Sequence, residues 1–382
     1  MRILHTSDLH IGKKVNNYDL LEDQRYVLQQ IVDRFGEDDI DALVIAGDLY
    51  DTKGPSSDVV GCVDWFLTSL SQTNKPVFIV AGNHDSPERV AYGSSLLARQ
   101  NIYVSPVFDG EIKPIVLEDE FGPVNFWLIP FVRPQHVRAV WPEDKINNYT
   151  DALNSIVSRM DIDTNQRNVV LVHQFVVCGS KSPETSESET ISLGSLDNVN
   201  ANIFDDFDYV AMGHIHRPQQ MGRPTCRYSG SILKYSFSEA RDTKSCCVVD
   251  LTDKNTDVKV DKFVLKPLHD MREIKGDIDI LLSQEVIDGQ NCEDYLHITL
   301  TDDEVEPDKQ ARLRHVYTRI MAVDYDNSFT YAQGIQGEYA DIDSDKTVLE
   351  HFKDFFLKQV GTELNCEQEK IVVDTLNEVE ED

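Results

Sequence analysis

Short apolar runs alternate with helix-like stretches along the first 216 residues of the chain. The runs occupy residues 1–4, 42–46, 77–81, 169–172 and 209–212, and each is short enough to be a buried strand. Between them, residues 20–35 and 59–70 carry apolar side chains at helical spacing. This alternation of strand and helix predicts an α/β fold in which helices cover the faces of a sheet.

The pattern changes after residue 216. Strand-like segments at residues 227–233, 245–251 and 258–265 could close a second sheet against the first. Pro267 and Gly276 bracket a boundary, and residues 277–320 read as a small α/β unit with a strand at 295–300. We therefore expect three parts, at residues 1–268, 269–344 and 345–382. The third part has apolar residues at helical spacing, namely Val348, Leu349, Phe352, Phe355, Phe356, Val372, Leu376 and Val379.

A Ser-, Glu- and Thr-rich stretch at residues 178–200 predicts a long surface loop, either a flexible connector or a lid. No apolar stretch approaches the roughly 20 residues that span a bilayer, and the N-terminus lacks a signal-peptide layout. The seven cysteines are an odd number without CxxC spacing, which argues against a disulfide framework or a thiolate zinc site. These features favour a cytoplasmic protein.

The formal net charge of -31 is unusual for a protein that binds a polyanion. Two interpretations remain open. Either the substrate is not a polyanion, or divalent cations, a local basic patch and a basic partner offset the repulsion at the site.

Each of the five apolar runs ends on side chains that bind divalent metals. In order along the chain these are Asp8 and His10, Asp48, Asn83 with His84 and Asp85, His173, and His214 with His216. Taken singly, such residues are more often strand caps, tight turns or hydrogen-bonded core residues. Ligands of α/β sheets gather beyond the carboxyl ends of the strands, so the five endings jointly predict one pocket.

Asp, His and Asn suit manganese, iron, zinc or magnesium. Seven candidate ligands, namely Asp8, His10, Asp48, Asn83, His173, His214 and His216, are more than one ion accommodates beside water and substrate. We therefore expect two ions bridged by Asp48, an arrangement that phosphatases and nucleases use. His84 is left as a general acid or phosphate stabiliser, and Asp85 is expected to orient its imidazole.

The same residues, in order and spacing, resemble the calcineurin-like metallophosphoesterase signature. The stretches at residues 6–12, 47–52 and 82–87, and later those at 228–231 and 266–268, are similar to the bacterial SbcD nuclease subunits. The resemblance covers nearly the whole chain. It implies a β-sandwich flanked by helices, followed by a capping domain and by C-terminal helices that dock on a partner.

For the individual residues, the resemblance implies that Asp8, His10 and His216 hold one manganese ion. Asn83, His173 and His214 would hold the other, with Asp48 as the bridge. It further implies a double-strand exonuclease and single-strand and hairpin endonuclease, working in DNA repair and recombination as a homodimer within a heterotetramer with an SbcC-type ATPase. Some relatives have a histidine where this chain has Asp51.

Two other functions use the same features. A phosphomonoesterase or phosphoprotein phosphatase would have the same metal cluster, and the negative charge mildly favours it, although such an enzyme does not need the appendage and the terminal helices. A non-catalytic scaffold on this fold would be expected to have lost ligands, and none is missing from the sequence.

Overall fold

The computed structural model describes residues 1–189, 197–302 and 307–326, together with single residues and residue pairs between 349 and 372. The chain divides into two compact units, Met1–Met271 and Arg272–Asp382. The predicted partner-binding segment at residues 345–382 lies almost wholly outside the described residues. Within the described part of the chain, no helix is long and apolar enough to cross a membrane.

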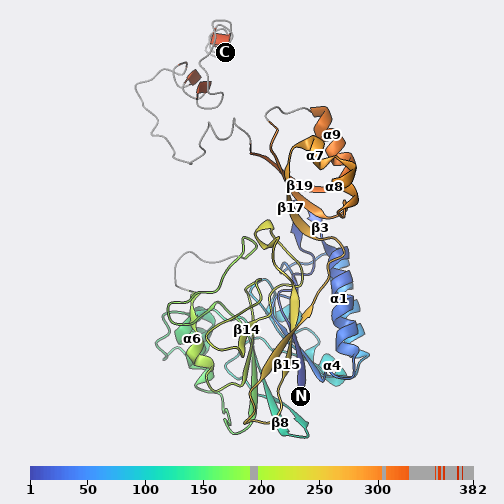
Figure 1. Cartoon of the computed structure of the whole chain (residues 1–382). Helices are drawn as coiled ribbons and strands as arrows, with labels where there is room; N and C mark the ends of the chain where they lie inside the picture. The colour runs from blue at the N-terminus through green and yellow to red at the C-terminus, as the bar shows by residue number, and fades with distance from the viewer. Residues whose placement is uncertain are drawn as a thin grey trace. The chain divides into compact units, whose positions relative to one another are not determined.

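The first unit contains two six-stranded sheets (Figure 1). The first sheet has the order β16 (Lys259–Val264), β15 (Ser245–Asp250), β1 (Arg2–Thr6), β4 (Ala42–Ala46), β5 (Val77–Val80) and β6 (Ile102–Val104). Strands β1, β4, β5 and β6 are parallel, and β15 and β16 extend the sheet in antiparallel fashion beside β1. All four parallel strands therefore end at the same edge.

The second sheet has the order β13 (Gln219–Gln220), β14 (Cys226–Tyr228), β12 (Tyr209–Gly213), β9 (Arg167–His173), β8 (Gly122–Ile129) and β7 (Ile115–Asp119). Its four central strands are parallel, and the two edge strands are antiparallel to their neighbours. The predicted strand at residues 227–233 is wrong beyond Tyr228. The expectation that all three later segments form a second sheet is also wrong, since β15 and β16 join the first sheet.

The two sheets pack face to face over one apolar core, to which both contribute. Ile3, Val44 and Phe78 of the first sheet lie in the same buried cluster as Phe126 and Leu171 of the second. The rings of Phe78 and Phe126 stack across this interface with centroids 4.1 Å apart. The predicted β-sandwich is confirmed, and the packing brings the carboxyl ends of the two parallel sets together.

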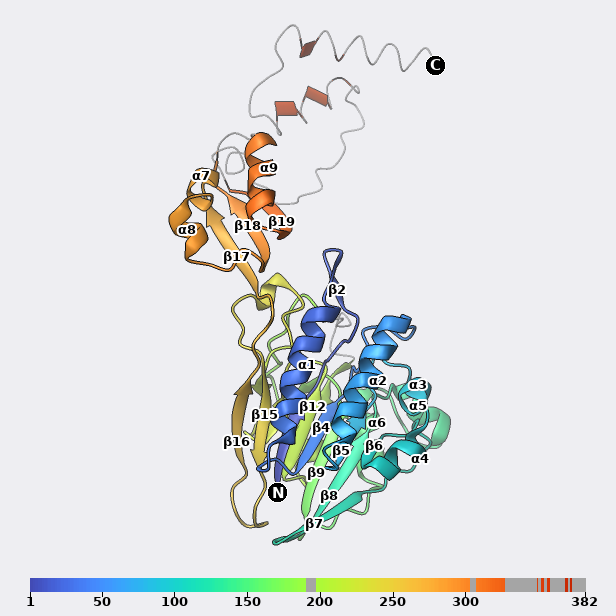
Figure 2. The same cartoon turned by 90° about the vertical axis from the view of Figure 1, so that its right-hand side faces the viewer.

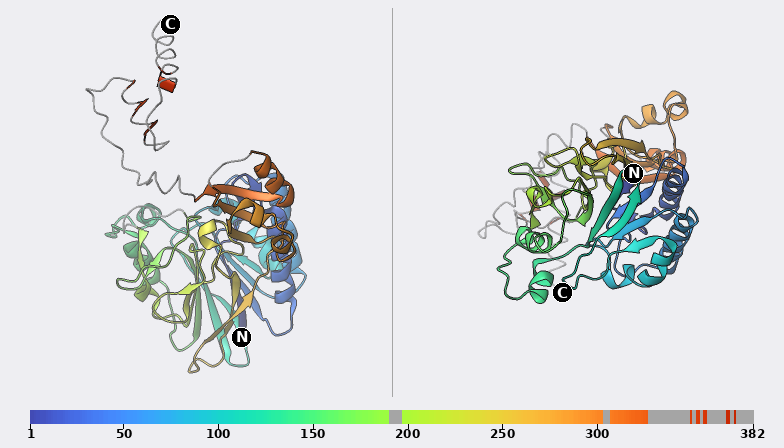
Figure 3. Two further views of the ribbon diagram at one scale, coloured as in Figure 1. Left: turned by 45° about the horizontal axis from the view of Figure 1, so that its top comes forward. Right: turned by 90° about the horizontal axis from the view of Figure 1, so that it is seen from below.

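Helices cover the outer faces of the sandwich. α1 (Leu21–Gly36) and α2 (Ser57–Ser71) lie side by side against the first sheet, as Figure 2 shows. α6 (Tyr149–Val157) packs against β9 and β12 on the other side, and Figure 3 shows the two helical layers at opposite faces. The helices predicted at residues 20–35 and 59–70 are confirmed as α1 and α2. Their side chains Val27, Ile31 and Phe66 are fully buried.

Shorter elements connect these layers: β2 (Lys14–Val15), β3 (Tyr18–Asp19), α3 (Pro87–Val90), α4 (Ser94–Leu97), η1 (Ala98–Gln100), α5 (Pro134–Val140), β10 (Val176–Val177), β11 (Val199–Asn200), η3 (Ala201–Phe204) and η4 (Phe237–Glu239).

The second unit is a small α/β body with its own core. It contains β17 (Met271–Gly276), α7 (Ile278–Leu281), α8 (Gln284–Asp288), β18 (Tyr295–Leu300), α9 (Pro307–Val316) and β19 (Arg319–Tyr325). The strands form one sheet in the order β17-β18-β19, and Leu296, Ile298 and Leu313 are buried in its core. The strand predicted at residues 295–300 is confirmed. The units divide after Met271, whereas the sequence placed the boundary after residue 268.

Candidate metal centre

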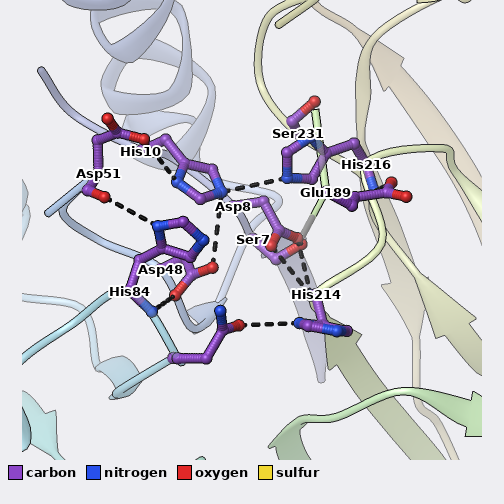
Figure 4. Close-up of polar contacts among 12 residues, drawn as sticks. Ser7, Asp8, His10, Asp48, Asp51, His84, Glu189, His214, His216 and Ser231 are labelled. Carbon is purple, nitrogen blue, oxygen red and sulfur yellow. Dashed lines mark hydrogen bonds and ion pairs between the residues drawn. The ribbon is translucent and has the colours of Figure 1, made fainter. Parts of the chain in front are cut away.

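The structure brings all of the predicted ligands to the edge where the parallel strands of both sheets end. Asp8 and His10 follow β1, Asp48 follows β4, and Asn83 follows β5. From the second sheet, His173 is the last residue of β9, and His214 and His216 follow β12. Figure 4 shows the side chains of Asp8, His10, Asp48, His214 and His216 turned toward one another. Residues that are far apart in the sequence therefore share one site because two parallel sheets end together.

The backbone of these loops adopts a conformation that L-residues rarely use. Eight described non-glycine residues have positive φ, and four of them are predicted ligands, namely Asp8 (52°), His10 (43°), Asp48 (51°) and His214 (102°). The other four are asparagines, which tolerate this region. Strain of this kind persists where the surrounding structure holds it and is common at functional sites. The loops are therefore shaped to direct these side chains inward.

Two glycines allow the loops to approach closely. A Cβ atom on Gly47, whose φ is +95°, would lie 2.1 Å from Nδ1 of His173, and a Cβ on Gly82 would lie 2.1 Å from Oδ1 of Asp48. Any larger residue would push a predicted ligand away. The Gly-Asp and Gly-Asn pairs in the sequence thus have a steric reason as well as a conformational one.

Asp48 lies between the two predicted ligand sets. Its Oδ2 atom is 3.5 Å from Nε2 of His10 and 3.2 Å from Nε2 of His173, and its Oδ1 accepts a hydrogen bond from the backbone N–H of His84. Asp48 is 2% exposed. Burial alone would raise the pKa of its carboxyl group, but the neighbouring His173, His10 and His84 outweigh burial and hold that pKa below its usual range. The carboxylate is therefore charged.

His173, Asn83 and His214 form a second group of contacts. Oδ1 of Asn83 lies 2.9 Å from Nε2 of His173 and 2.8 Å from Nδ1 of His214. Nδ1 of His173 donates to the carbonyl of Ala46 at 2.8 Å, so its Nε2 faces two acceptor oxygens. Burial lowers the pKa of His173, yet the charge of Asp48 and their hydrogen bond raise it to about 9. Positive charge is therefore favoured at the His173 ring, next to Asp48.

His10 and His216 face each other with Nε2 atoms 3.1 Å apart. The outer nitrogen of each ring faces an oxygen atom: Nδ1 of His10 lies 3.3 Å from Oδ1 of Asp51, and Nδ1 of His216 lies 2.6 Å from Oγ of Ser188. Protons on the outer nitrogens leave two lone pairs directed at each other. Burial lowers the pKa of His10, which favours the neutral ring.

The donor set fits divalent cations. Ligand atoms of three groups lie within 4.8 Å of one another: Asp8 with His10 and His216, Asp8 with Asp48 and His173, and His10 with Asp48 and His84. The facing lone pairs of His10 and His216 repel each other, and so do the acceptor oxygens of Asp48 and Asn83, unless positive charge lies between them. Metal-binding histidines commonly use the outer nitrogen for a hydrogen bond, as His173 and His216 do here. The residues can therefore hold two ions with Asp48 between them.

A network behind His216 could not be anticipated from the sequence. Oγ of Ser188 donates to Oε1 of Glu239 at 2.6 Å, and Oε1 of Glu189 accepts from the backbone N–H of His216 at 2.6 Å. Nζ of Lys244 donates to the other oxygen of Glu239 at 2.5 Å. Ser188 and Glu189 belong to the 178–200 loop, so its described part is more than a connector. No sequence signal distinguishes these residues from others in a Ser- and Glu-rich stretch.

The expected pairing of Asp85 with His84 is wrong. The Asp85 carboxylate accepts hydrogen bonds from the backbone N–H groups of Leu49, Tyr50 and Gly82 at 3.1, 2.9 and 2.8 Å. It therefore ties the loop after β4 to the loop after β5. His84 is oriented instead by the backbone carbonyl of Asp51, which accepts from its Nδ1 at 2.9 Å. Burial and the charge of Asp48 raise the pKa of Asp85 to about 6.

The centre has a closed side and an open side. Asp8, His10, Asp48, His173 and His216 are buried, whereas Asn83, His84 and His214 are half-buried. A substrate therefore has access from the side of these last three residues.

Comparison with known proteins agrees with this geometry. Residues 1–218 match the calcineurin-like phosphoesterase family. The chain is 34% identical over 362 residues to the SbcD subunit of the SbcCD nuclease of Staphylococcus epidermidis, covering 92% of each protein. The chain belongs to the SbcD branch of the calcineurin-like phosphoesterases. The SbcD subunit of Staphylococcus saprophyticus is 32% identical over 359 residues, again with 92% of each protein covered.

The later part of the chain has its own match. Residues 267–360 match the family described as the type 5 capsule protein repressor C-terminal domain. A crystal structure of a dimetal phosphatase from Danio rerio covers 69% of this chain and 99% of that chain, at 10% identity and a TM-score of 0.41. That likeness is too distant to support an argument about the site.

Replacing Asp48 and His84 should separate metal binding from chemistry. Asp48→Ala removes the oxygen that lies between the two ligand sets, so we expect lower occupancy of both ions. His84→Ala should leave both ions bound while slowing phosphodiester cleavage roughly a hundredfold or more, the scale of one positioned acid. Metal analysis of the purified variants provides the measurement. Parallel loss of metal and activity in His84→Ala would show that His84 is a ligand.

Ser188→Ala should weaken metal binding without touching a ligand. The change removes the hydroxyl that faces Nδ1 of His216, and loss of such a supporting partner weakens metal affinity about 10- to 100-fold. Titration calorimetry with Mn²⁺ measures the effect. Ser182→Ala, an exposed serine of the same loop, is the control and should bind like the unaltered protein. Equal affinities of the two variants would contradict a role for Ser188.

Proposed function

We propose that this chain is the nuclease subunit of an SbcCD-type complex and cleaves DNA phosphodiesters with two divalent metal ions, Mn²⁺ in particular. In this proposal it acts as a double-strand exonuclease and as an endonuclease on single strands and hairpins. The single observation that supports it most is the position of Asp48, buried between Nε2 of His10 and Nε2 of His173, one histidine from each predicted ligand set. Both staphylococcal relatives are subunits of a nuclease, which favours a nuclease over a phosphatase.

The proposed roles follow from what each residue contacts. Bound ions would position the phosphodiester and acidify the attacking water. Asp8, His10 and His216 would hold one ion and Asn83, His173 and His214 the other. Because Nδ1 of His84 already donates to the Asp51 carbonyl, a proton on its Nε2 makes the ring an imidazolium. That form can stabilise a phosphate oxygen or donate its proton to the leaving oxygen.

Asp85 supports this arrangement indirectly. By accepting three backbone N–H groups it fixes the loop that carries Asp48 relative to the loop that carries Asn83 and His84. Asp51 contributes through two groups, since its carbonyl orients His84 and its carboxylate faces both His10 and Lys13. Asp51, which stands where some relatives have a histidine, therefore still contacts and orients residues of the candidate site.

The acidic composition bears on the partner. A net charge of -31 repels DNA, so an SbcC-type ATPase would supply much of the binding, and the chain would act as a homodimer within a heterotetramer. We propose that residues 269–344 form a capping domain and that the helices expected at 345–382 dock on the ATPase. A phosphatase or a scaffold remains the alternative that activity assays must reject.

Activity on two substrates tests the proposal. With Mn²⁺, the purified chain should cleave a DNA hairpin, and an SbcC-type ATPase with ATP should increase the rate. Hydrolysis of p-nitrophenyl phosphate should be much slower, because this aryl monoester has no nucleoside on either side of its phosphate for the protein to bind. Asp48→Ala is the inactive control. Hydrolysis of the monoester alone would establish a phosphatase, and inactivity on both substrates would favour a scaffold.

Deleting residues 345–382 tests the partner role. If these residues dock on the ATPase, the shortened protein should keep its melting temperature and its Mn²⁺-dependent cleavage of single-stranded DNA. It should lose ATP-stimulated cleavage and co-purification with the ATPase. A thermal melt paired with a pull-down provides the measurement. A lower melting temperature with intact co-purification would show that the segment packs on its own chain instead.

A further inference from the structure

A cavity of about 440 Å³ opens beside the candidate metal centre, on its exposed side. It is bordered by Asn83, by Phe108 and Phe131, and by Lys53, Arg133 and His136. These residues come from the loops after β4, β5, β6 and β8 and from the start of α5. Its volume lies in the range of small-molecule sites. Asn83 is shared with the metal centre, so an occupant would be adjacent to the reacting phosphate.

Basic side chains gather at this cavity in a strongly acidic chain. Lys53, Arg133 and His136 are exposed. Among the described residues, no carboxylate lies within ion-pair distance of these three. Glu88 is the exposed acidic residue of the wall, and its Oε2 accepts from Oγ of Ser86 at 2.9 Å. Burial lowers the pKa of His136, and Arg133 and Lys53 lower it further, as expected of cations close together.

The wall between the cations and the metal centre is aromatic. The ring centroid of Phe131 lies 6.4 Å from that of His173, a predicted ligand, and Arg133 places its guanidinium carbon 6.0 Å from the Phe131 ring. Phe108 and the aliphatic Val107 and Val140 complete an apolar surface. The cavity thus combines aromatic and aliphatic side chains with the cations Lys53 and Arg133.

We propose that this cavity binds the nucleotide next to the scissile phosphate of a single DNA strand, with the base on Phe131 and a backbone phosphate on Arg133 and Lys53. The inference rests on the proposed nuclease function and adds the substrate contacts. Proteins that bind single strands combine aromatic faces for the bases with cations for the backbone. A free phosphate would use the cations but not the aromatic wall, and an apolar peptide would use the wall but not the cations.

A second cavity shares part of its lining with the first. It has a volume of about 240 Å³, and Asn83, Phe131 and Arg133 border it as well, together with Tyr149, His214 and the acidic Asp197. The three shared residues therefore separate two hollows that both adjoin the metal centre. A strand crossing this ridge would place one nucleotide on each side of the reacting phosphate. Arg133 at this ridge, with Lys53 in the first cavity, would supply the local positive charge through which an acidic chain contacts DNA.

Binding of a phosphorothioate oligo(dT) that resists cleavage tests the inference, measured by anisotropy with the full chain and Mn²⁺. Arg133→Ala should weaken binding and reduce the slope of log affinity against log salt by about one. Phe131→Leu, which keeps apolar bulk but lacks a stacking face, should weaken binding about tenfold. It should also abolish the preference of the protein for oligo(dT) over an abasic strand.

Controls come from the opposite end of the sheets. Arg99→Ala, in η1 before β6, matches the charge change, and Phe121→Leu, in the turn before β8, matches the aromatic change. Both should bind DNA like the unaltered protein. Melting temperature and metal content verify that all four variants are folded and loaded. For cleavage, Arg133→Ala should lower the ratio of kcat/KM for an oligonucleotide to that for bis(p-nitrophenyl) phosphate about tenfold.

The outcomes separate this inference from the proposed function. If the unaltered protein cleaves DNA but Arg133→Ala and Phe131→Leu match their controls, the nucleotide site is wrong and the nuclease stands. If the unaltered protein hydrolyses only the small diester, the proposed function is wrong, and the binding data alone decide the nucleotide site. Equal loss of binding for inorganic phosphate and for the oligonucleotide in Arg133→Ala, with no effect of Phe131→Leu, would reduce the cavity to a phosphate site.

Discussion

The buried charge of Asp48 is the constraint around which the candidate site is organised. An ionised carboxylate that is 2% exposed is costly unless partners surround it. Here those partners are the backbone N–H of His84 and the rings of His10 and His173. Two of these three groups come from the first sheet and one from the second. The groups that stabilise this charge therefore come from both sheets and meet where the two sheets end together. The site thus depends on how the two sheets of the β-sandwich pack.

The buried charge of Asp48 also explains the presence of residues that are not predicted metal ligands. Gly47 and Gly82 leave the space that His173 and Asp48 occupy, and Asp85 fastens the two loops from behind. The pKa of Asp85 is raised by its burial and, to a smaller extent, by the charge of Asp48 nearby. Behind His216, Oγ of Ser188 contacts both Nδ1 of that ring and the Glu239 carboxylate, and Oε1 of Glu239 lies 3.9 Å from the same nitrogen. These supporting residues lie on the buried side of the centre. The half-buried side is therefore left open to a substrate.

The open side also reconciles the charge of the chain with a DNA substrate. A net charge of -31 describes the whole surface, whereas a strand near the metals meets a local field. Bound divalent ions, together with Lys53 and Arg133 at the neighbouring cavity, would make that field positive. Repulsion elsewhere on the surface would keep duplex DNA away unless a partner presents it. The composition thus favours an assembly over an isolated nuclease.

The sequence by itself determined the α/β class, the helices at residues 20–35 and 59–70, the strand at 295–300 and the set of residues that meet at the site. It could do so because hydrophobic periodicity and polar strand endings are local signals, and because the motif order resembles one family. Tertiary structure decided what local signals do not carry. It assigned β15 and β16 to the first sheet, since β1 offers its free edge to them. It gave Asp85 to backbone amides and His84 to the Asp51 carbonyl, because side-chain partners depend on how separate loops pack. It also placed Ser188 behind His216 and Phe131 beside His173, contacts between residues 28 and 42 positions apart that no spacing rule connects.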